Sequence, residues 1–162
     1  MKAEVQAHME IRRAESGDVA AIRAIVEVAY APYEPRIGRV PAPVVADYPA
    51  LVAAGDAWVC ISDGRVVGVL VIRQAGDALE LENVAVDPAC QRRGYGRALI
   101  AFAEQQAREL GLGTVTLYTN EAMVENLRLY PRLGFAETER RVEDGYRRVF
   151  FEKSLDDHVL RS

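Results

Sequence analysis

Residues 84–99 read VAVDPACQRRGYGRAL. An apolar run closed by an Asp-Pro pair is typical of a strand and its end, and the apolar spacing after the second glycine begins a helical pattern. The N-terminus of a helix presents unpaired N–H groups and the positive end of the helix dipole, and glycine lets the backbone approach an anion closely. Positive charge is added within six residues by Arg92, Arg93 and Arg97. The stretch therefore predicts a strand–turn–helix unit that binds a pyrophosphate.

Two glycines alone do not name the ligand. A dinucleotide-binding Rossmann turn needs a third glycine where this chain has Leu99, and no Gly-Lys-Ser/Thr follows to make a nucleotide P-loop. An ordinary tight connection between a strand and a helix would use the same residues. The surrounding elements have to decide between these interpretations.

Apolar periodicity and turn residues predict the rest of the chain. We expect strands at 11–13, 58–62, 65–73, 79–86, 115–118, from 135 onward and at 146–155, and helices at about 16–30, 44–54, 95–110 and 121–133. Asp-Gly pairs at 63–64 and 144–145 predict hairpin turns. The order predicts one α/β domain over residues 11–155, a mixed sheet with helices on its faces, between a flexible tail at 1–10 and a tail at 156–162.

Composition excludes several classes of protein. The 162 residues carry a net charge of −4, which argues against a general nucleic-acid or membrane-surface role. The longest apolar run, residues 66–72, is far shorter than the ~20 residues of a membrane span, and the first residues lack the apolar core of a signal peptide. Cys60 and Cys90 are far apart, and the two histidines lie near the termini, so we expect no disulfide, no metal site and a cytoplasmic location.

Three features resemble one enzyme family. QRRGYG at residues 91–96 matches the Gln/Arg-x-x-Gly-x-Gly/Ala motif of the GNAT N-acetyltransferase superfamily. The strand LENVAVDP at 81–88 is similar to that superfamily's fourth strand, and LYPRLGF at 129–135 resembles its Leu-Tyr-x-Lys-x-Gly-Phe signature. The element order agrees across residues 11–155. The resemblance implies the GNAT acyl-CoA N-acyltransferase fold, with a mostly antiparallel mixed sheet and helices on both faces.

The same resemblance implies acetyl-CoA as cosubstrate. The family's fourth and fifth strands splay apart, the fourth pairs with the pantetheine arm, and the turn's amides hold the pyrophosphate. Where the family often has an asparagine this chain has Met123, and Asn120 or Asn126 can replace it. The expected cofactor-binding residues are Val84, Ala85, Val86, Gln91, Arg92, Arg93, Gly94, Tyr95, Gly96, Arg97, Asn120 and Asn126.

Acetylation of an amine needs a base, because alkyl amines with a pKa of ~10.4 are protonated at neutral pH. Glu82 matches the position where many small-molecule members keep a polar base, and we favour it over Glu80, which matches the glutamate of the histone-acetylating branch; the alternative is that both are solvated strand residues. Tyr130 matches the family's tyrosine acid, although a role in packing the helix against the sheet stays open. Pro131 is a departure from the signature that leaves the direction of Tyr130 uncertain.

The sequence indicates the acceptor less specifically than the fold or the cosubstrate. By resemblance its pocket is walled by Tyr30, Tyr33, Arg36, Arg39 and Tyr48, by residues 118–121, and by Tyr146 and Arg147. Pocket arginines would suit an amine that bears a carboxylate or phosphate, but Arg36 and Arg39 could be solvated loop residues. We expect a small primary amine such as an amino acid or related metabolite. The alternatives are a protein lysine or N-terminal acetyltransferase and a non-catalytic acyl-CoA-binding module, and a homodimer stays open.

Overall fold

A computed structural model describes residues 9–155, so the expected C-terminal tail and most of the N-terminal one lie outside the described residues. Seven strands form one sheet in the order β1-β2-β3-β4-β5-β7-β6. Their bounds are β1 Met9–Arg13, β2 Ala57–Ser62, β3 Arg65–Ala75, β4 Ala78–Val86, β5 Thr114–Asn120, β6 Ala136–Glu143 and β7 Tyr146–Ser154. Only β4 and β5 pair in parallel; the other neighbours are antiparallel. The predicted mixed, mostly antiparallel sheet is confirmed.

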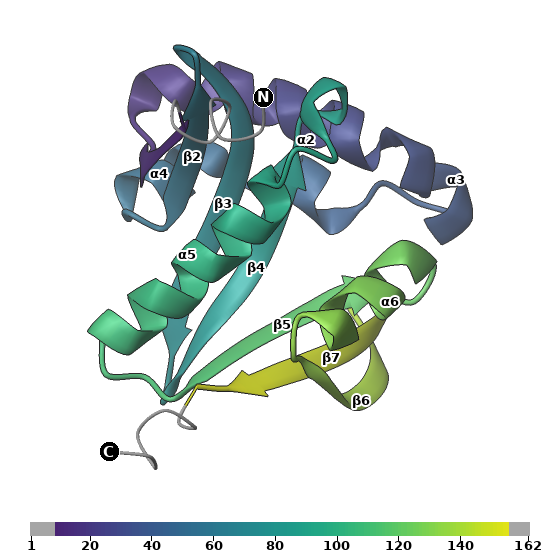
Figure 1. Cartoon of the computed structure of the whole chain (residues 1–162). Helices are drawn as coiled ribbons and strands as arrows, with labels where there is room; N and C mark the ends of the chain where they lie inside the picture. Colours follow the sequence, from purple (N-terminus) through teal and green to yellow (C-terminus); the bar gives the residue numbers. More distant parts are fainter. Residues whose placement is uncertain (1–8, 156–162) are drawn as a thin grey trace.

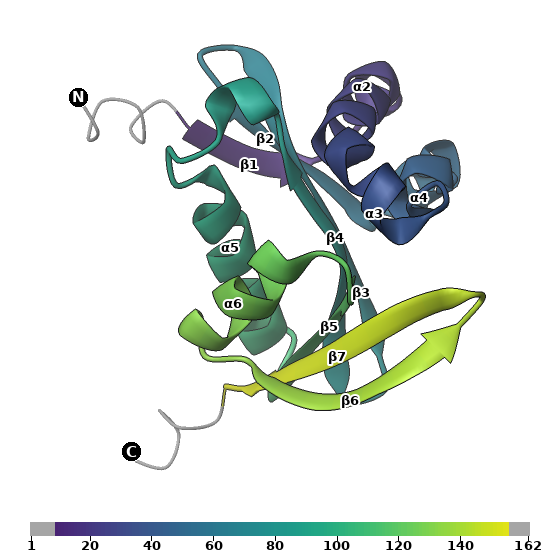
Figure 2. The same cartoon turned by 90° about the vertical axis from the view of Figure 1, so that its right-hand side faces the viewer.

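Helices cover both faces of this sheet (Figure 2). One face carries α5, Tyr95–Glu109, and α6, Val124–Arg132. The other carries α2, Val19–Tyr30, and the short helices α3, Glu34–Ile37, and α4, Tyr48–Ala53. Single 3-10 turns lie at Ser16–Asp18, Ala31–Tyr33, Ala42–Val45 and Pro88–Cys90. None of the helices between residues 9 and 155 has the length and apolar character needed to cross a membrane.

Both predicted hairpin turns are present. Asp63 and Asp144 have φ of 51° and 54°, and the glycine after each has φ of 79° and 83°. Two successive left-handed residues are the signature of a two-residue turn that matches the twist of the strands. The β2–β3 and β6–β7 hairpins therefore form where the sequence predicts them.

Three predicted boundaries were wrong for local reasons. The helix expected at 44–54 is a 3-10 turn followed by α4, because the Asp47 side chain accepts the Ala50 N–H and starts the helix there. The helix expected from 121 begins at Val124, since Asn120 Oδ1 accepts the Ala122 N–H and holds those residues in a turn. Met9 and Glu10, expected in the tail, belong to β1.

A bulge in β4 sets the geometry of the centre. Val71 pairs with Asn83 and Ile72 pairs with Leu81, so Glu82 is an extra residue on its strand. Because side chains alternate along a strand, one extra residue reverses the faces beyond it. Leu81 accordingly packs in the core under α5, whereas Ala85 packs in the core under α2.

Beyond the bulge β4 and β5 separate. Their register runs only from Ala78 with Thr114 to Leu81 with Leu117, although β4 continues to Val86 and β5 to Asn120. Figure 1 shows the two strands together at one end and apart at the other, with the N-terminus of α5 and the start of α6 near the open end. The separation leaves an edge of β4 without a neighbouring strand inside the sheet.

Two apolar cores, one on each face, hold the sheet to its helices. Gly68, in the middle of β3, lies against Leu99 of α5. A Cβ at this position would lie 3.0 Å from Leu99 Cδ1 and 3.3 Å from Cys60 Cβ. Leu99 and Cys60 are both fully buried, so neither can move aside without disturbing the packed core.

Replacing Gly68 by alanine should therefore lower the free energy of unfolding by about 1–3 kcal/mol, the usual cost of overpacking a core. Gly17→Ala is the matched control, because nothing lies within 4 Å of a Cβ there and the residue is exposed. Urea unfolding of both variants measures the difference. Equal stability of the two would show that the contact between β3 and α5 is looser than these distances indicate.

Candidate functional site

Two connected cavities fill the gap between β4 and β5. The outer cleft is lined by residues 84–86, by residues 91–97 at the start of α5, by the adjoining face of α6, and by Ala29, Tyr30 and Tyr33 of the opposite side. The inner pocket is lined by Tyr30, Ile37, Pro41, Ala42, Pro43, Leu81, Glu82, Asn83, Val84, Leu117, Tyr118, Thr119, Asn120, Met123, Asn126, Tyr130, Tyr146 and Arg148. The two share Tyr30, Val84, Met123, Asn126 and Tyr130, so a ligand can extend from one into the other.

The start of α5 forms the floor of the outer cleft. Gly94 caps the helix with φ of 88° and offers no side-chain acceptor, and Ala98 N–H donates the first bond of the helix, to Gly94 O. The N–H groups before Ala98 are thus not used by the helix itself. A Cβ on Gly96 would meet Val86 Cγ2 at 3.8 Å, an ordinary contact, so the turn leaves open space above its backbone. This donor set and this space fit an anionic phosphate group.

Charge in the outer cleft agrees with that fit. Five arginines line it, Arg92, Arg93, Arg97, Arg128 and Arg132, against one carboxylate, Glu125. Arginine forks suit phosphate oxygens because they donate two parallel hydrogen bonds. Arg128 and Arg132 come from α6 and were not among the predicted residues, so the positive charge reaches around both walls of the cleft.

Eleven of the twelve predicted cofactor residues line the outer cleft; Asn120 lines only the inner pocket, where its amide oxygen accepts the Ala122 N–H. Asn126 lines both cavities and donates to Thr119 Oγ1 at 3.0 Å. Tyr95 contributes through its main chain, since its side chain is buried in the core and donates to Ser62 Oγ at 2.8 Å. Asn126 is therefore better placed than Asn120 to contact a cofactor in the outer cleft.

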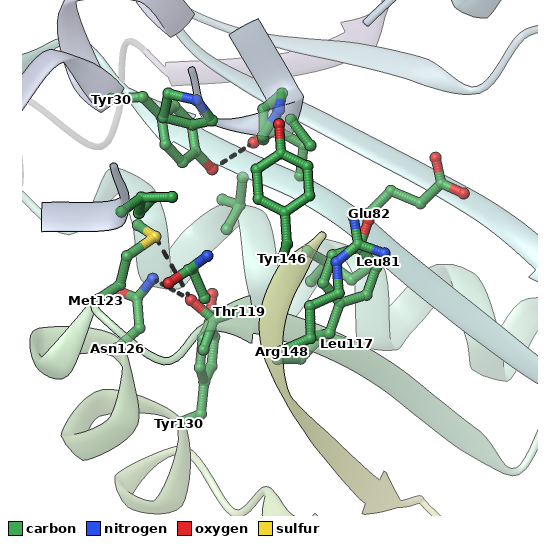
Figure 3. Close-up of a pocket in the computed structure, with 18 residues that line it drawn as sticks. Tyr30, Leu81, Glu82, Leu117, Thr119, Met123, Asn126, Tyr130, Tyr146 and Arg148 are labelled. Atoms are coloured by element: carbon green, nitrogen blue, oxygen red, sulfur yellow. Dashed lines mark hydrogen bonds between the residues drawn. The ribbon is translucent and has the colours of Figure 1, made fainter. Parts of the chain in front are cut away.

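Among residues 9–155, Glu82 is the only carboxylate that lines the inner pocket. Burial raises its pKa above the ordinary value, its neighbour Arg73 opposes this effect, and the nearby charge of Glu80 adds to it. The carboxylate forms an ion pair with Arg73 and extends away from Tyr130 (Figure 3). Glu80 also reaches Arg73, at 3.8 Å, but does not line the pocket. Glu82, at the bulge, therefore lies in the pocket wall, whereas Glu80, before the bulge, lies outside it.

Tyr130 occupies the junction of the two cavities. It projects from α6 into the pocket (Figure 3), and its ring packs against Phe135 and Phe151 with centroids 5.8 and 5.6 Å away. Burial raises its pKa to about 12, so the hydroxyl keeps its proton throughout the neutral range. The ring packs α6 on the sheet and the side chain also lines both cavities, so the packing role does not exclude the predicted role as an acid.

A buried hydrogen-bond chain supports the residue after the bulge. Tyr30 Oη donates to Asn83 Oδ1 at 2.7 Å, Asn83 Nδ2 donates to Tyr48 Oη at 3.1 Å, and Tyr48 Oη donates to Pro43 O at 2.6 Å. Asn83 is 6% exposed, so removal of any member would leave a buried polar group unpaired. This chain fixes β4 against α2 at the point where β4 and β5 separate.

Residues 31–43, here called the strap, close one side of the inner pocket. Ile37 and the Pro41–Pro43 stretch line the pocket, and side chains hold the strap at two places. Arg36 donates to Glu125 at the start of α6, at 3.0 Å. Arg39 stacks over the Tyr146 ring at 4.0 Å and donates to Asp144 O, while Tyr146 Oη donates to Val40 O. The strap thus joins both the helix and the last hairpin.

The expected acceptor wall needs correction in several places. Tyr30, residues 118–120 and Tyr146 line the inner pocket, whereas Arg36 and Arg39 hold the strap and Tyr48 lies beneath the pocket with Asn83. Tyr33 lines the outer cleft. Neither Glu121 nor Arg147 lines either cavity; Glu121 lies near Arg140, and the neighbour Arg148 takes the place expected for Arg147.

Sequence reasoning missed Arg148 and Asn83. Strand alternation could have indicated Arg148, because Tyr146 and Arg148 lie two residues apart on one strand and share a face. Asn83 could not be assigned in this way, since the bulge before it reverses the alternation.

Comparison with known proteins places this geometry in a family. Residues 22–135 match the model of the Acetyltransferase (GNAT) family. The uncharacterized N-acetyltransferase YvbK of Bacillus subtilis is 28% identical over 82 residues, 50% of this chain and 53% of that protein. The ribosomal protein bS18-alanine N-acetyltransferase of Escherichia coli is 32% identical over 75 residues, 46% of this chain and 51% of that protein. The chain thus covers about half the length of these two relatives.

Solved structures share the fold. The crystal structure of the S18-alanine N-acetyltransferase of Escherichia coli has a TM-score of 0.68 at 23% identity, covering 91% of this chain and 94% of that one. The PaiA N-acetyltransferase of Thermoplasma acidophilum, solved in complex with coenzyme A, has a TM-score of 0.71 at 16% identity, covering 90% and 98%. The family model spans most of residues 9–155, and the fold expected from the motifs is present. The chain therefore belongs to the GNAT family of acetyltransferases.

Proposed function

We propose that this chain is an acetyl-CoA-dependent N-acetyltransferase that acts on a primary amine of a small molecule. The observation that carries the proposal is the continuous path from the arginine-lined N-terminus of α5 to a pocket that holds Glu82 and Tyr130. Solved neighbours support acetyl-CoA as cosubstrate, since PaiA was crystallised with coenzyme A and YncA of Salmonella typhimurium with acetyl-CoA.

The outer cleft and the edge of β4 would bind the cosubstrate. When bound, acetyl-CoA supplies an acetyl group activated as a thioester. The amides at the start of α5 and the surrounding arginines would hold its phosphates, and the free edge of β4 at Val84 and Val86 would bind its pantetheine arm. Asn126 stands between the two cavities, where it can orient the chain of the ligand.

Proton transfer falls to Glu82 and Tyr130. Glu82 accepts the proton of the ammonium group, and because its carboxylate turns toward Arg73, the proton reaches it through water. Tyr130 Oη holds a proton at neutral pH and can give it to a leaving thiolate. The amine, once neutral, would attack the thioester carbonyl and form the new C–N bond; the C–S bond then breaks, and the departing thiolate takes the proton of Tyr130.

A small acceptor fits this pocket better than a peptide. The strap closes one side, and Arg36 and Arg39 join it to α6 and to the β6–β7 hairpin. The relative that acetylates an alanine of a ribosomal protein keeps a protein acceptor as the second candidate, and acyl-CoA binding without turnover is the third. We also propose a cytoplasmic location, which is compatible with the free thiols of Cys60 and Cys90. A homodimer is a further proposal.

Gly96→Pro should weaken acetyl-CoA binding at least tenfold, because proline removes one N–H from the anion site and fills space above the turn. Gly96→Ala should bind nearly as the wild type, since it keeps the N–H and its Cβ meets only Val86 at 3.8 Å. Calorimetric titration with acetyl-CoA measures both, with thermal unfolding to confirm that each variant is folded. Unchanged binding by folded Gly96→Pro would remove the helix N-terminus from the site.

Glu82→Gln should lower kcat/KM by about 10²–10⁴, the usual contribution of a general base. The wild-type rate should fall as pH decreases through the raised pKa of Glu82, so the acid limb lies above the ordinary 4.5, and Glu82→Gln should lack this limb. Glu80→Gln is the matched control: it removes a charge that raises the Glu82 pKa, so activity is kept and the limb moves to lower pH. The reverse pattern, in which Glu80→Gln is inactive, would make Glu80 the base.

A further inference from the structure

The described part of the chain contributes one basic side chain to the inner pocket. Among its lining residues Arg148 is the only lysine, arginine or histidine, and Glu82 is the only carboxylate. Arg148 comes from β7, opposite Asn120 of β5, and projects into the pocket together with Tyr146 (Figure 3). A pocket with one group of each sign, among otherwise uncharged side chains, can select for charge on its ligand.

Arg148 is held rigidly. It is only 8% exposed, and its guanidinium lies 4.2 Å from the Tyr118 ring and 5.5 Å from the Tyr146 ring. Tyr146 is fixed in turn, because its hydroxyl donates to Val40 O at 2.6 Å and Arg39 stacks on the same ring at 4.0 Å. Contacts with the rings restrict the guanidinium plane, so its hydrogen bonds must be made along its edges.

Of the three guanidinium nitrogens of Arg148, only Nη1 makes a hydrogen bond or ion pair with another residue between 9 and 155. Nη1 contacts Glu143 and lies 4.0 Å from Asp144, whereas Nε and Nη2 have no protein partner among residues 9–155. Within the same residues, no fully shielded side-chain nitrogen or oxygen lacks a partner. Nε and Nη2 are therefore accessible, and Arg148 is a lining residue of the inner pocket.

Glu143 does not neutralise Arg148 completely. One of its oxygens accepts from Arg148, and the other accepts from Arg141 Nη2 at 3.1 Å. The carboxylate is thus divided between two arginines, and neither Glu143 nor Asp144 lines the pocket. A second anion can bind the free edge of Arg148 without displacing the first.

We propose that the acceptor is a small amine that also carries a carboxylate, and that Nε and Nη2 of Arg148 bind this carboxylate as a two-pronged fork. The inference rests on the proposed function and narrows its substrate class to molecules of the amino-acid type. A carboxylate fits the planar fork of an arginine. Binding it there places the amine in the same pocket as Glu82 and Tyr130, and decarboxylated amines lack the group that orients them.

The test compares the standard amino acids that have a primary amine and a single carboxylate (all except proline, aspartate and glutamate), together with β-alanine and 4-aminobutyrate, each with its decarboxylated amine, by CoA release from acetyl-CoA. We expect kcat/KM to be about 10–150-fold higher for carboxylated acceptors, the range for a hydrogen-bonded charged group worth ~1.5–3 kcal/mol. Equal or better turnover of the amines without carboxylate would overturn the inference and leave the proposed function intact. If no amine at all releases CoA, the proposed function fails.

Variants of Arg148 and of its neighbour test whether Arg148 causes the preference for carboxylated acceptors. Arg148→Gln should abolish the preference for carboxylated acceptors while changing kcat/KM for amines without carboxylate little, and Arg148→Lys should fall between, because it keeps the charge without the fork. Arg147→Gln is the matched control, since that exposed neighbour lines neither cavity. An equal loss on both kinds of acceptor would reduce Arg148 to a structural role and overturn the inference.

A binding measurement without acetyl-CoA keeps the test independent of turnover. The melting temperature of the wild type and of Arg147→Gln should rise with the carboxylated acceptors and their N-acetyl products at millimolar concentration, and should not rise with the decarboxylated amines. Arg148→Gln, if folded, should show no such rise. A rise with both kinds of probe in the wild type would contradict carboxylate recognition, even if Arg148→Gln does not fold.

Discussion

The separation of β4 and β5 is the constraint on which the rest of the structure depends. Parallel strands that part after four paired positions leave backbone groups on both edges that need other partners. In this chain the parting begins at Glu82, the extra residue of the bulge. The same residue thus ends the pairing, exchanges the faces of the strand beyond it, and brings a carboxylate to the wall of the cavity. The bulge at Glu82 therefore shapes both the sheet and the candidate site.

The pocket keeps hydroxyl protons in place by burial. Tyr30, Tyr118 and Tyr130 all have a pKa raised mainly by loss of water, so none of them ionises near neutral pH. Charges are instead confined to the edges of the pocket, where Glu82 and Arg148 each have a partner of opposite sign outside it. A site built in this way presents fixed dipoles in the middle and charge at its rim, which favours a ligand with separated polar ends.

Much of this was predictable from sequence, because the informative signals are local. The glycine turn, the Asp-Gly hairpins and the apolar periodicity each depend on a few adjacent residues, and they predicted the sheet, α5 and the turn that precedes it. Pairing between distant segments left no such signal. The bonds of Asn83 with Tyr30 and Tyr48 and the contacts of Arg39 with the last hairpin follow from tertiary packing. The cleft could therefore be predicted, whereas the acceptor pocket could not.

The strap has a consequence for how this protein can diverge. Within the described part of the chain, the two apolar cores include no residue from 31–43. Apart from the hydrogen bond that Pro43 O accepts from Tyr48, the strap is attached to α6 and to the last hairpin by exposed polar contacts. Such contacts contribute little to the free energy of unfolding. Mutations can therefore accumulate in much of this segment at little cost in stability, and those at Ile37 and at residues 41–43 alter the wall of the inner pocket. Divergence can thus change the shape of that pocket while the start of α5 and the outer cleft stay the same.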